Sequence, residues 1–228
     1  MPHVNPVARS VRLDLRAAAP RLPALMLGLV LFGFGIALMV EAGLGLGSWE
    51  ALHQGIARQT GIEIGTVSIL LGVPILALWW PLGERPGIGT LLNVLTIGTS
   101  TNVGIAVLPT APDDATVVQL AMMLAGVAVI AIGSAIYLST DLGPGPRDGL
   151  MTGVAKRFGW SIRRSRTAIE LTVLVIGWAL GGGVGLGTVV FALGIGPLLQ
   201  LALRLFDRDG RVGRRRRVEL EQAGAVGE

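Results

Sequence analysis

Cysteine is absent from the 228 residues, and histidine occurs only twice, as His3 and His53. The lack of cysteine excludes disulfide bonds, thiol catalysis and thiolate-bound metal ions. Two histidines are too few for a histidine-rich metal site, and no set of nucleophile, base and acid suited to hydrolysis is visible. From the sequence we therefore expect neither an enzyme nor a bound metal or cofactor.

Charge is also scarce. Charged residues make up 15% of the chain and hydrophobic residues 51%, with a mean hydropathy of +0.66, a balance typical of a membrane protein. The pI of 10.9 comes from arginines in the N-terminal arm 1–21, the C-terminal tail 207–228 and the loop 141–165. Basic segments beside apolar runs fix orientation by remaining in the cytoplasm. We therefore expect a lipid bilayer, and no nucleic acid, as the partner, with Arg214–Arg217 against anionic lipid.

Six segments that are poor in charge are predicted to cross the membrane, because a crossing helix needs about 20 apolar residues. They cover residues 22–40, 64–82, 88–108, 117–139, 166–180 and 186–203. No small-residue cleavage site closes the first segment, so we expect it to be retained rather than removed as a signal peptide. Trp79 and Trp80 are expected at a membrane–water interface. The predicted fold class is an all-α polytopic membrane protein.

Two glycine-rich breaks interrupt these segments, and each is followed by a helix too short to span. Residues 43–47 precede a short helix that reaches Arg58, with Ser48 predicted as its N-cap and Glu50 in its first turn. Residues 141–159 contain the sequence GPGPRDG and a second short amphipathic helix.

The two breaks belong to an internal repeat. A shift of 98 positions superimposes one half of the chain on the other without a gap; it places Gly28, Gly35, Gly45, Gly47, Glu50, Gly55, Trp80, Gly87 and Thr90 on Gly126, Gly133, Gly143, Gly145, Asp148, Gly153, Trp178, Gly185 and Thr188. The match predicts two units, 22–109 and 117–206, joined by the linker 110–116. Because each unit crosses the membrane three times, the second should enter in the opposite direction. The expected architecture is thus an inverted repeat with a broken segment after the first helix of each unit, in the bacterial inner membrane with both termini in the cytoplasm.

The breaks are the best candidates for a solute path. Helix N-termini carry partial positive charge and free amides, and non-helical backbone at membrane depth is tolerated only inside protein or along a water-filled cavity. The candidate backbone positions are Gly45, Gly47, Gly143 and Gly145. The alternative is that these glycines form interfacial turns and serve only close helix packing.

Polar side chains near the breaks and in the spans complete the candidate path. They are Ser48, Glu50, His53, Asn93, Thr96, Arg147, Asp148 and Glu170. Each also has a structural interpretation. Glu50 and Asp148 could complement helix dipoles, Glu170 could pair with Arg166 one turn away, and His53 could be a solvated side chain. Arg147 could pair with the adjacent Asp148 or meet an anionic solute. Asn93 and Thr96 could line a polar face or satisfy polar groups between helices.

The motifs resemble one known group of proteins. The stretches that carry the resemblance are GLGSWEALHQGIARQTGIEIGTVSI, WWPLGERPGIGTLLNVL, LGPGPRDGLMTG and TAIELTVLVIGWALGGGVGLGT. They are similar to the YczE/YyaS/YitT family of bacterial integral membrane proteins, and to the YczE branch most closely. The resemblance implies a multi-pass inner-membrane protein, and it supplies no catalytic or ligand residues.

Two functions follow as hypotheses. The first is a small transporter or channel for a polar or anionic solute, lined by the two breaks and the third span. The second is a non-transporting accessory protein that anchors or regulates a partner through the cytoplasmic loop 141–165.

Overall fold

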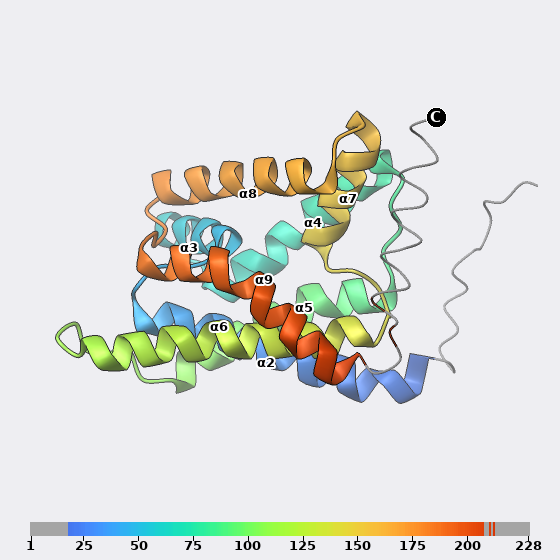
Figure 1. Ribbon diagram of the computed structural model, residues 1–228. Coiled ribbons are helices and arrows are strands. Elements are labelled where there is room, and N and C mark those ends of the chain that lie inside the picture. Colours follow the sequence, from blue (N-terminus) through green and yellow to red (C-terminus); the bar gives the residue numbers. More distant parts are fainter. Residues whose placement is uncertain (1–17, 208–209, 211, 213–228) are drawn as a thin grey trace, which may run out of the picture.

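The computed structural model describes residues 18–207, 210 and 212, and all regular structure in this part is helical (Figure 1). A short 3-10 helix, η1 (Ala19–Arg21), precedes eight α-helices. These are α2 (Leu22–Ala42), α3 (Ser48–Thr60), α4 (Ile64–Leu82), α5 (Ile88–Val107), α6 (Thr116–Ser139), α7 (Pro146–Phe158), α8 (Ile162–Ala179) and α9 (Leu186–Phe206). The all-α prediction is confirmed. Most of the basic arm and tail, including Arg214–Arg217, lies outside the described residues.

Five helices are long and apolar enough to cross a membrane: η1 with α2, α4, α5, α6 and α9. The helix α8 is not among them, since its first half carries three arginines and Glu170. It also begins earlier than predicted, at Ile162, because the Ser161 side chain caps it by accepting a hydrogen bond from the backbone amide of Arg164 at 3.2 Å. The chain is therefore a multi-pass membrane protein with five candidate spans, and the sixth span stays a prediction.

The helices α2 and α6 form the most extensive helix pairing of the described residues. Gly28 lies against Gly133, and Gly35 lies against Gly126, so residue numbers rise along one helix as they fall along the other and the two helices are antiparallel. Small residues at a helix interface let the backbones approach closely. A Cβ added at Gly133 would come within 2.6 Å of the Gly28 carbonyl oxygen, which leaves no room for a side chain there.

The remaining helices pack in matching pairs. α2 packs on α5 as α6 packs on α9, α3 packs on α8 as α7 packs on α4, and α3 contacts α4 as α7 contacts α8. Backbone hydrogen bonds repeat the pattern, from Gly187 to the Leu44 carbonyl at 2.7 Å and from Gly89 to the Leu142 carbonyl at 2.9 Å. The 98-residue shift relates α2, α3, α4 and α5 to α6, α7, α8 and α9. Exchanging the helices of each related pair turns every one of these contacts into its counterpart.

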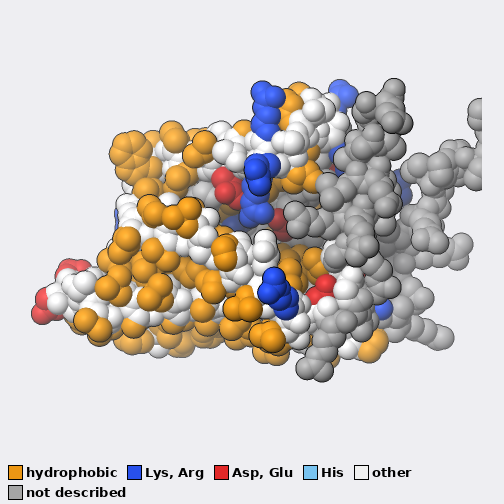
Figure 2. Space-filling view, in the orientation of Figure 1, with side chains coloured by type: hydrophobic (Ala, Val, Ile, Leu, Met, Phe, Trp, Pro, Cys, Tyr) orange, Lys and Arg blue, Asp and Glu red, His pale blue; other side chains and the backbone are white. Residues whose placement is uncertain are grey.

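The outer surface of the bundle is largely apolar in the view of Figure 2. Trp80 and Trp178 occupy equivalent positions and are 88% and 66% exposed. Trp79, by contrast, is 1% exposed, and its Nε1 donates to the Pro146 carbonyl at 3.0 Å. The interface position predicted for Trp79 is therefore wrong, because this ring packs inward between α4 and the start of α7.

Candidate functional site

Both short helices begin at a glycine that lacks a capping side chain. The N-cap of α3 is Gly47 and that of α7 is Gly145, with no side-chain hydrogen bond to either first turn. Ser48 is the first residue of α3 rather than its N-cap, so that prediction is wrong by one position. Upstream, Gly45 and Gly143 have φ of 106° and 136°, a region that glycine adopts readily. No side chain at the N-cap position thus accepts a hydrogen bond from the first-turn amides of α3 or α7.

Each break lies on the other unit's last helix. Gly45 packs against the backbone of Gly185 at the start of α9, and Gly143 packs against Thr90 at the start of α5. The Thr90 Oγ1 donates to the Pro144 carbonyl at 2.8 Å. These contacts hold the ends of α3 and α7 in place, and the two upstream glycines serve close backbone packing rather than lining a cavity.

The two short helices meet at a cavity of about 180 Å³ between the units. Eight of the predicted path residues line it: Ser48, Glu50, His53, Asn93, Gly145, Arg147, Asp148 and Glu170. Its lining does not include Gly45, Gly47, Gly143 or Thr96. Thr96 is buried and its hydroxyl faces the sulfur of Met26 at 3.8 Å, so it packs between α5 and α2.

Most of the lining residues come from equivalent positions in the two units. The pairs are Phe32 and Ile130, Ser48 and Pro146, Trp49 and Arg147, Glu50 and Asp148, His53 and Met151, Ser68 and Arg166, Gly72 and Glu170, Asn93 and Phe191, and Ile97 and Ile195. The cavity therefore lies where the two units meet.

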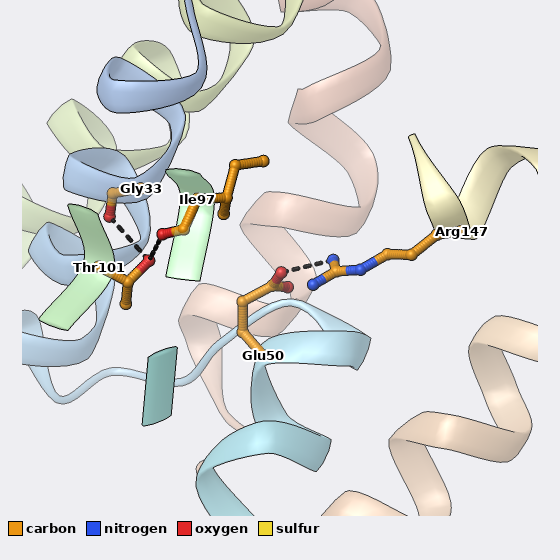
Figure 3. A network of polar contacts seen from close by, with 5 residues as sticks. All are labelled: Gly33, Glu50, Ile97, Thr101 and Arg147. Atoms are coloured by element: carbon orange, nitrogen blue, oxygen red, sulfur yellow. Dashed lines mark hydrogen bonds and ion pairs between the residues drawn. The ribbon is translucent and has the colours of Figure 1, made fainter. Parts of the chain in front are cut away.

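An ion pair joins the units across this cavity. The Arg147 guanidinium donates to Glu50 Oε1 at 2.6 Å, as Figure 3 shows. The same guanidinium lies over the Trp49 ring at 5.1 Å from its centroid. Glu50 is 4% exposed, and a charge buried to this degree is stable only when it is paired. The pair thus ties the first turn of α3 to that of α7.

Other polar groups of the lining are buried. His53 is 3% exposed and lies on α3, outside the five spans. Burial, and to a lesser extent the nearby Arg147 charge, lowers the pKa of its imidazole well below the usual value, so the ring is neutral at pH 7. The Tyr137 hydroxyl is hydrogen-bonded to Asp148. The Trp49 Nε1 is buried and has no hydrogen-bond partner among the described residues.

On α8, Arg166 Nε donates to Glu170 Oε1 at 2.9 Å, one turn apart. Both residues line the cavity as well. On the opposite side, the Thr101 hydroxyl of α5 donates to the carbonyls of Ile97 at 2.8 Å and Gly33 at 3.3 Å (Figure 3). The polar groups of α5 thus partly serve helix packing, whereas Arg166 and Glu170 of α8 line the cavity.

The far ends of the short helices are fixed at equivalent points. Arg58 on α3 donates to the Gly181 carbonyl in the turn between α8 and α9. Its equivalent on α7, Lys156, pairs with Glu84 in the turn between α4 and α5 at 2.8 Å. Each short helix therefore runs from the central cavity to the turn between the last two helices of the other unit.

Sequence reasoning missed Trp49, Ser68, Ser134 and Tyr137 as lining residues. The repeat held a signal for one of them, because Trp49 is equivalent to Arg147. Tyr137 carried no such signal, since its equivalent is Met39 and the chain offers no second tyrosine for comparison.

Comparison with known proteins identifies a family and several relatives of the chain. Residues 19–204 match a family of unknown function, DUF6198. An uncharacterized protein of Haemophilus influenzae is 41% identical over 184 residues, covering 81% of this chain and 84% of its own. The uncharacterized membrane protein YczE of Bacillus subtilis is 34% identical over 179 residues, covering 77% and 82%. YyaS of the same organism, also uncharacterized, is 27% identical over 187 residues, covering 80% and 92%.

No solved structure matches the chain. The family match spans most of the described residues, and two of the relatives exceed 30% identity over most of both chains. The chain therefore belongs to the DUF6198 family and, with YczE and YyaS among its relatives, to the YczE/YyaS family of membrane proteins.

Proposed function

We propose that the chain is an inverted repeat of two three-span units, with α8 as the sixth spanning helix. The antiparallel contact of α2 and α6 supports this, since the first helices of two units that enter the membrane in the same direction would run parallel. The matching contacts of the other helices support it as well. Charges on α8 are compatible with a spanning helix, because charged residues inside membranes face water-filled cavities or the bundle interior.

We infer that the protein is a small transporter or channel for a polar solute. The observation that carries this inference is that two broken helices, one from each unit, begin at one cavity. In many transporters, interrupted helices meet at the interface between inverted repeats and hold the substrate near mid-membrane. The paired origin of the lining residues supports the same position for this cavity.

The size and the polar groups of the cavity narrow the class of solute that it can bind. A cavity of roughly 150 Å³ can hold a molecule the size of benzene, so about 180 Å³ suits a solute of similar size. Arg147 and the uncapped helix N-termini can donate hydrogen bonds to its acceptor groups, and Glu50 and Asp148 can accept from its donors. A solute with groups of both kinds fits this lining better than a simple anion, which the two carboxylates would repel.

The proposed location is the bacterial inner membrane with both termini in the cytoplasm. Lys156, Arg157 and Arg163 lie around the turn between α7 and α8, and Arg85 lies in the turn between α4 and α5. In the proposed topology both turns are cytoplasmic, in agreement with the preference of lysine and arginine for that side.

Transport is tested with purified protein in two steps. Thermal unfolding is measured with glycine, urea, glycerol and sodium acetate as probes, and the flux of each into proteoliposomes is then followed by stopped-flow light scattering. We expect at least one probe to stabilise the protein and to enter faster than into empty liposomes. Glu50→Gln should reduce both effects, whereas Glu63→Gln, an exposed control, should not. The transport proposal is refuted if every probe enters the proteoliposomes at the same rate as it enters empty liposomes.

The alternative is an accessory role. Arg157, Arg163 and Arg164 are exposed beside one another around the turn from α7 to α8, and such a basic group suits an acidic protein surface. A crosslinker at Arg157→Cys should then capture a specific membrane protein in cells, and reversing the charges at 163 and 164 should abolish that capture while leaving the solute assays unchanged.

A further inference from the structure

The two units differ in one pair of helices. α4 packs along α5, but α8 has its packing contacts with α3 and α7, and α9 has its contacts with α6. Figure 1 shows α8 and α9 diverging from the short turn that joins them. The other extensive helix contacts of one unit are matched in the other, so this difference needs a local cause.

Glycines bring α4 against α5 in the first unit. A Cβ added at Gly65 would overlap the Gly98 carbonyl, and one added at Gly72 would lie 2.6 Å from a methyl group of Val94. Asn102 fastens the contact, because its Oδ1 accepts a hydrogen bond from the Gly65 amide at 2.7 Å. The seam between these helices is closed because two residues of α4 have no side chains.

The second unit has charged side chains at the same places. Arg163 is equivalent to Gly65, and Glu170 is equivalent to Gly72. Gly196, the equivalent of Gly98, has no atom within 4 Å of where its Cβ would be. The seam between α8 and α9 is therefore open, and the sequence itself prevents it from closing as the first seam does.

The open seam leads into the central cavity and has two unlike walls. Arg166 and Glu170 line the cavity from α8, with side chains 57% and 37% exposed. Ile195 and Leu199 line it from α9. On the face shown in Figure 2, basic and acidic side chains gather over α8 while the surrounding surface is mainly apolar. A wall with both charges is solvated by water and not by lipid tails.

We propose that the seam between α8 and α9 is the water-filled cytoplasmic entrance of the cavity, with the Arg166–Glu170 pair at its rim. The assignment to the cytoplasmic side rests on the orientation given under the proposed function. In the first unit the equivalent seam, between α4 and α5, is shut on the opposite side of the membrane. The structure thus represents a cavity open to one side only.

The chain has no native cysteine, so single cysteines report on this entrance without background. Leu199→Cys places a thiol on the seam, and Thr101→Cys places one at the equivalent position of the first unit, where Thr101 is 2% exposed and packs against α2. Both are treated in inside-out membrane vesicles with a membrane-impermeant methanethiosulfonate that carries a sulfonate. Unreacted thiols are counted by a gel shift with polyethylene glycol maleimide after denaturation.

We expect Leu199→Cys to react at least about tenfold faster than Thr101→Cys, since a buried thiol reacts only through local opening. If Thr101→Cys does not fold, Ser100→Cys takes its place, since Ser100 is 7% exposed and lies outside the cavity lining. The proposal is overturned if Leu199→Cys reacts only with the lipid-soluble N-ethylmaleimide, which would mean a lipid-filled seam, or only from the outside of intact cells. Fast labelling without solute flux would support the proposed entrance and refute the proposed transport function. Solute flux without labelling would refute the entrance alone.

Discussion

Replacing Gly133 by alanine should loosen the pairing of α2 with α6 and destabilise the whole protein. The new Cβ would lie 2.6 Å from the Gly28 carbonyl oxygen and 2.8 Å from the Phe32 amide nitrogen. Both are backbone atoms, so no side-chain rotation relieves the contact and α2 must move away from α6. Gly35→Ala, the equivalent change in the first unit, meets the Gly126 carbonyl at 2.9 Å and should have an effect of the same sign.

The magnitude follows from two opposed terms. Overpacking a well-filled interface costs about 1–3 kcal/mol, and alanine recovers up to about 1 kcal/mol over glycine through its helix propensity. For an overpacking cost in the middle of that range, about 2 kcal/mol, the net loss of unfolding free energy is about 1–2 kcal/mol. In a chain of this size each kcal/mol lowers Tm by about 2–4 °C, so we expect a decrease of several degrees.

The assay is thermal unfolding in detergent micelles, followed by intrinsic tryptophan fluorescence. Gly194→Ala on α9 is the matched control, because no atom lies within 4 Å of its added Cβ; it changes helix propensity alone and should leave Tm unchanged or raise it. The reasoning is refuted if Gly133→Ala and Gly194→Ala unfold at the same temperature.

Two further predictions concern the cavity and its support. Glu50→Gln or Arg147→Gln alone should each cost about 2–4 kcal/mol, because the remaining charge is left buried, and the double variant should cost less than the sum of the two; additive losses measured by thermal unfolding would mean that the 2.6 Å contact is not energetically coupled. Trp79→Phe should lower the unfolding free energy by about 1 kcal/mol through loss of the hydrogen bond to the Pro146 carbonyl, whereas Trp80→Phe at the 88% exposed neighbour should be neutral; equal effects of the two changes would contradict the inward position of Trp79.

Apolar runs and glycine breaks were sufficient to predict the helices. The predicted starts at Ile64, Ile88 and Leu186 agree with α4, α5 and α9. A glycine-rich turn directly precedes α5 and α9, and such local signals determine where a helix begins. The start of α8 was predicted four residues late, since the arginines suggested a loop while the Ser161 cap in fact begins the helix. Local chemistry thus decided the boundaries.

The arrangement of the cavity could not be derived in the same way. Glu50 and Arg147 meet although 97 positions separate them, whereas the sequence pointed to the adjacent Asp148 as the partner of the arginine. The choice depends on how α3 and α7 are held by the other unit's helices, through contacts such as Gly45 on Gly185. The repeat indicated that the two breaks are equivalent, but only packing shows which side chains face each other.

The central claim is that two equivalent units enter the membrane from opposite sides and present their broken helices to one cavity. Its most direct measurement is the labelling of single cysteines at Pro86 and Val184, exposed equivalent positions in the α4–α5 and α8–α9 turns, with a membrane-impermeant maleimide. The account predicts that Val184→Cys is labelled in intact cells and that Pro86→Cys is labelled only in inside-out vesicles. Labelling of both cysteines from the same side of the membrane would contradict it.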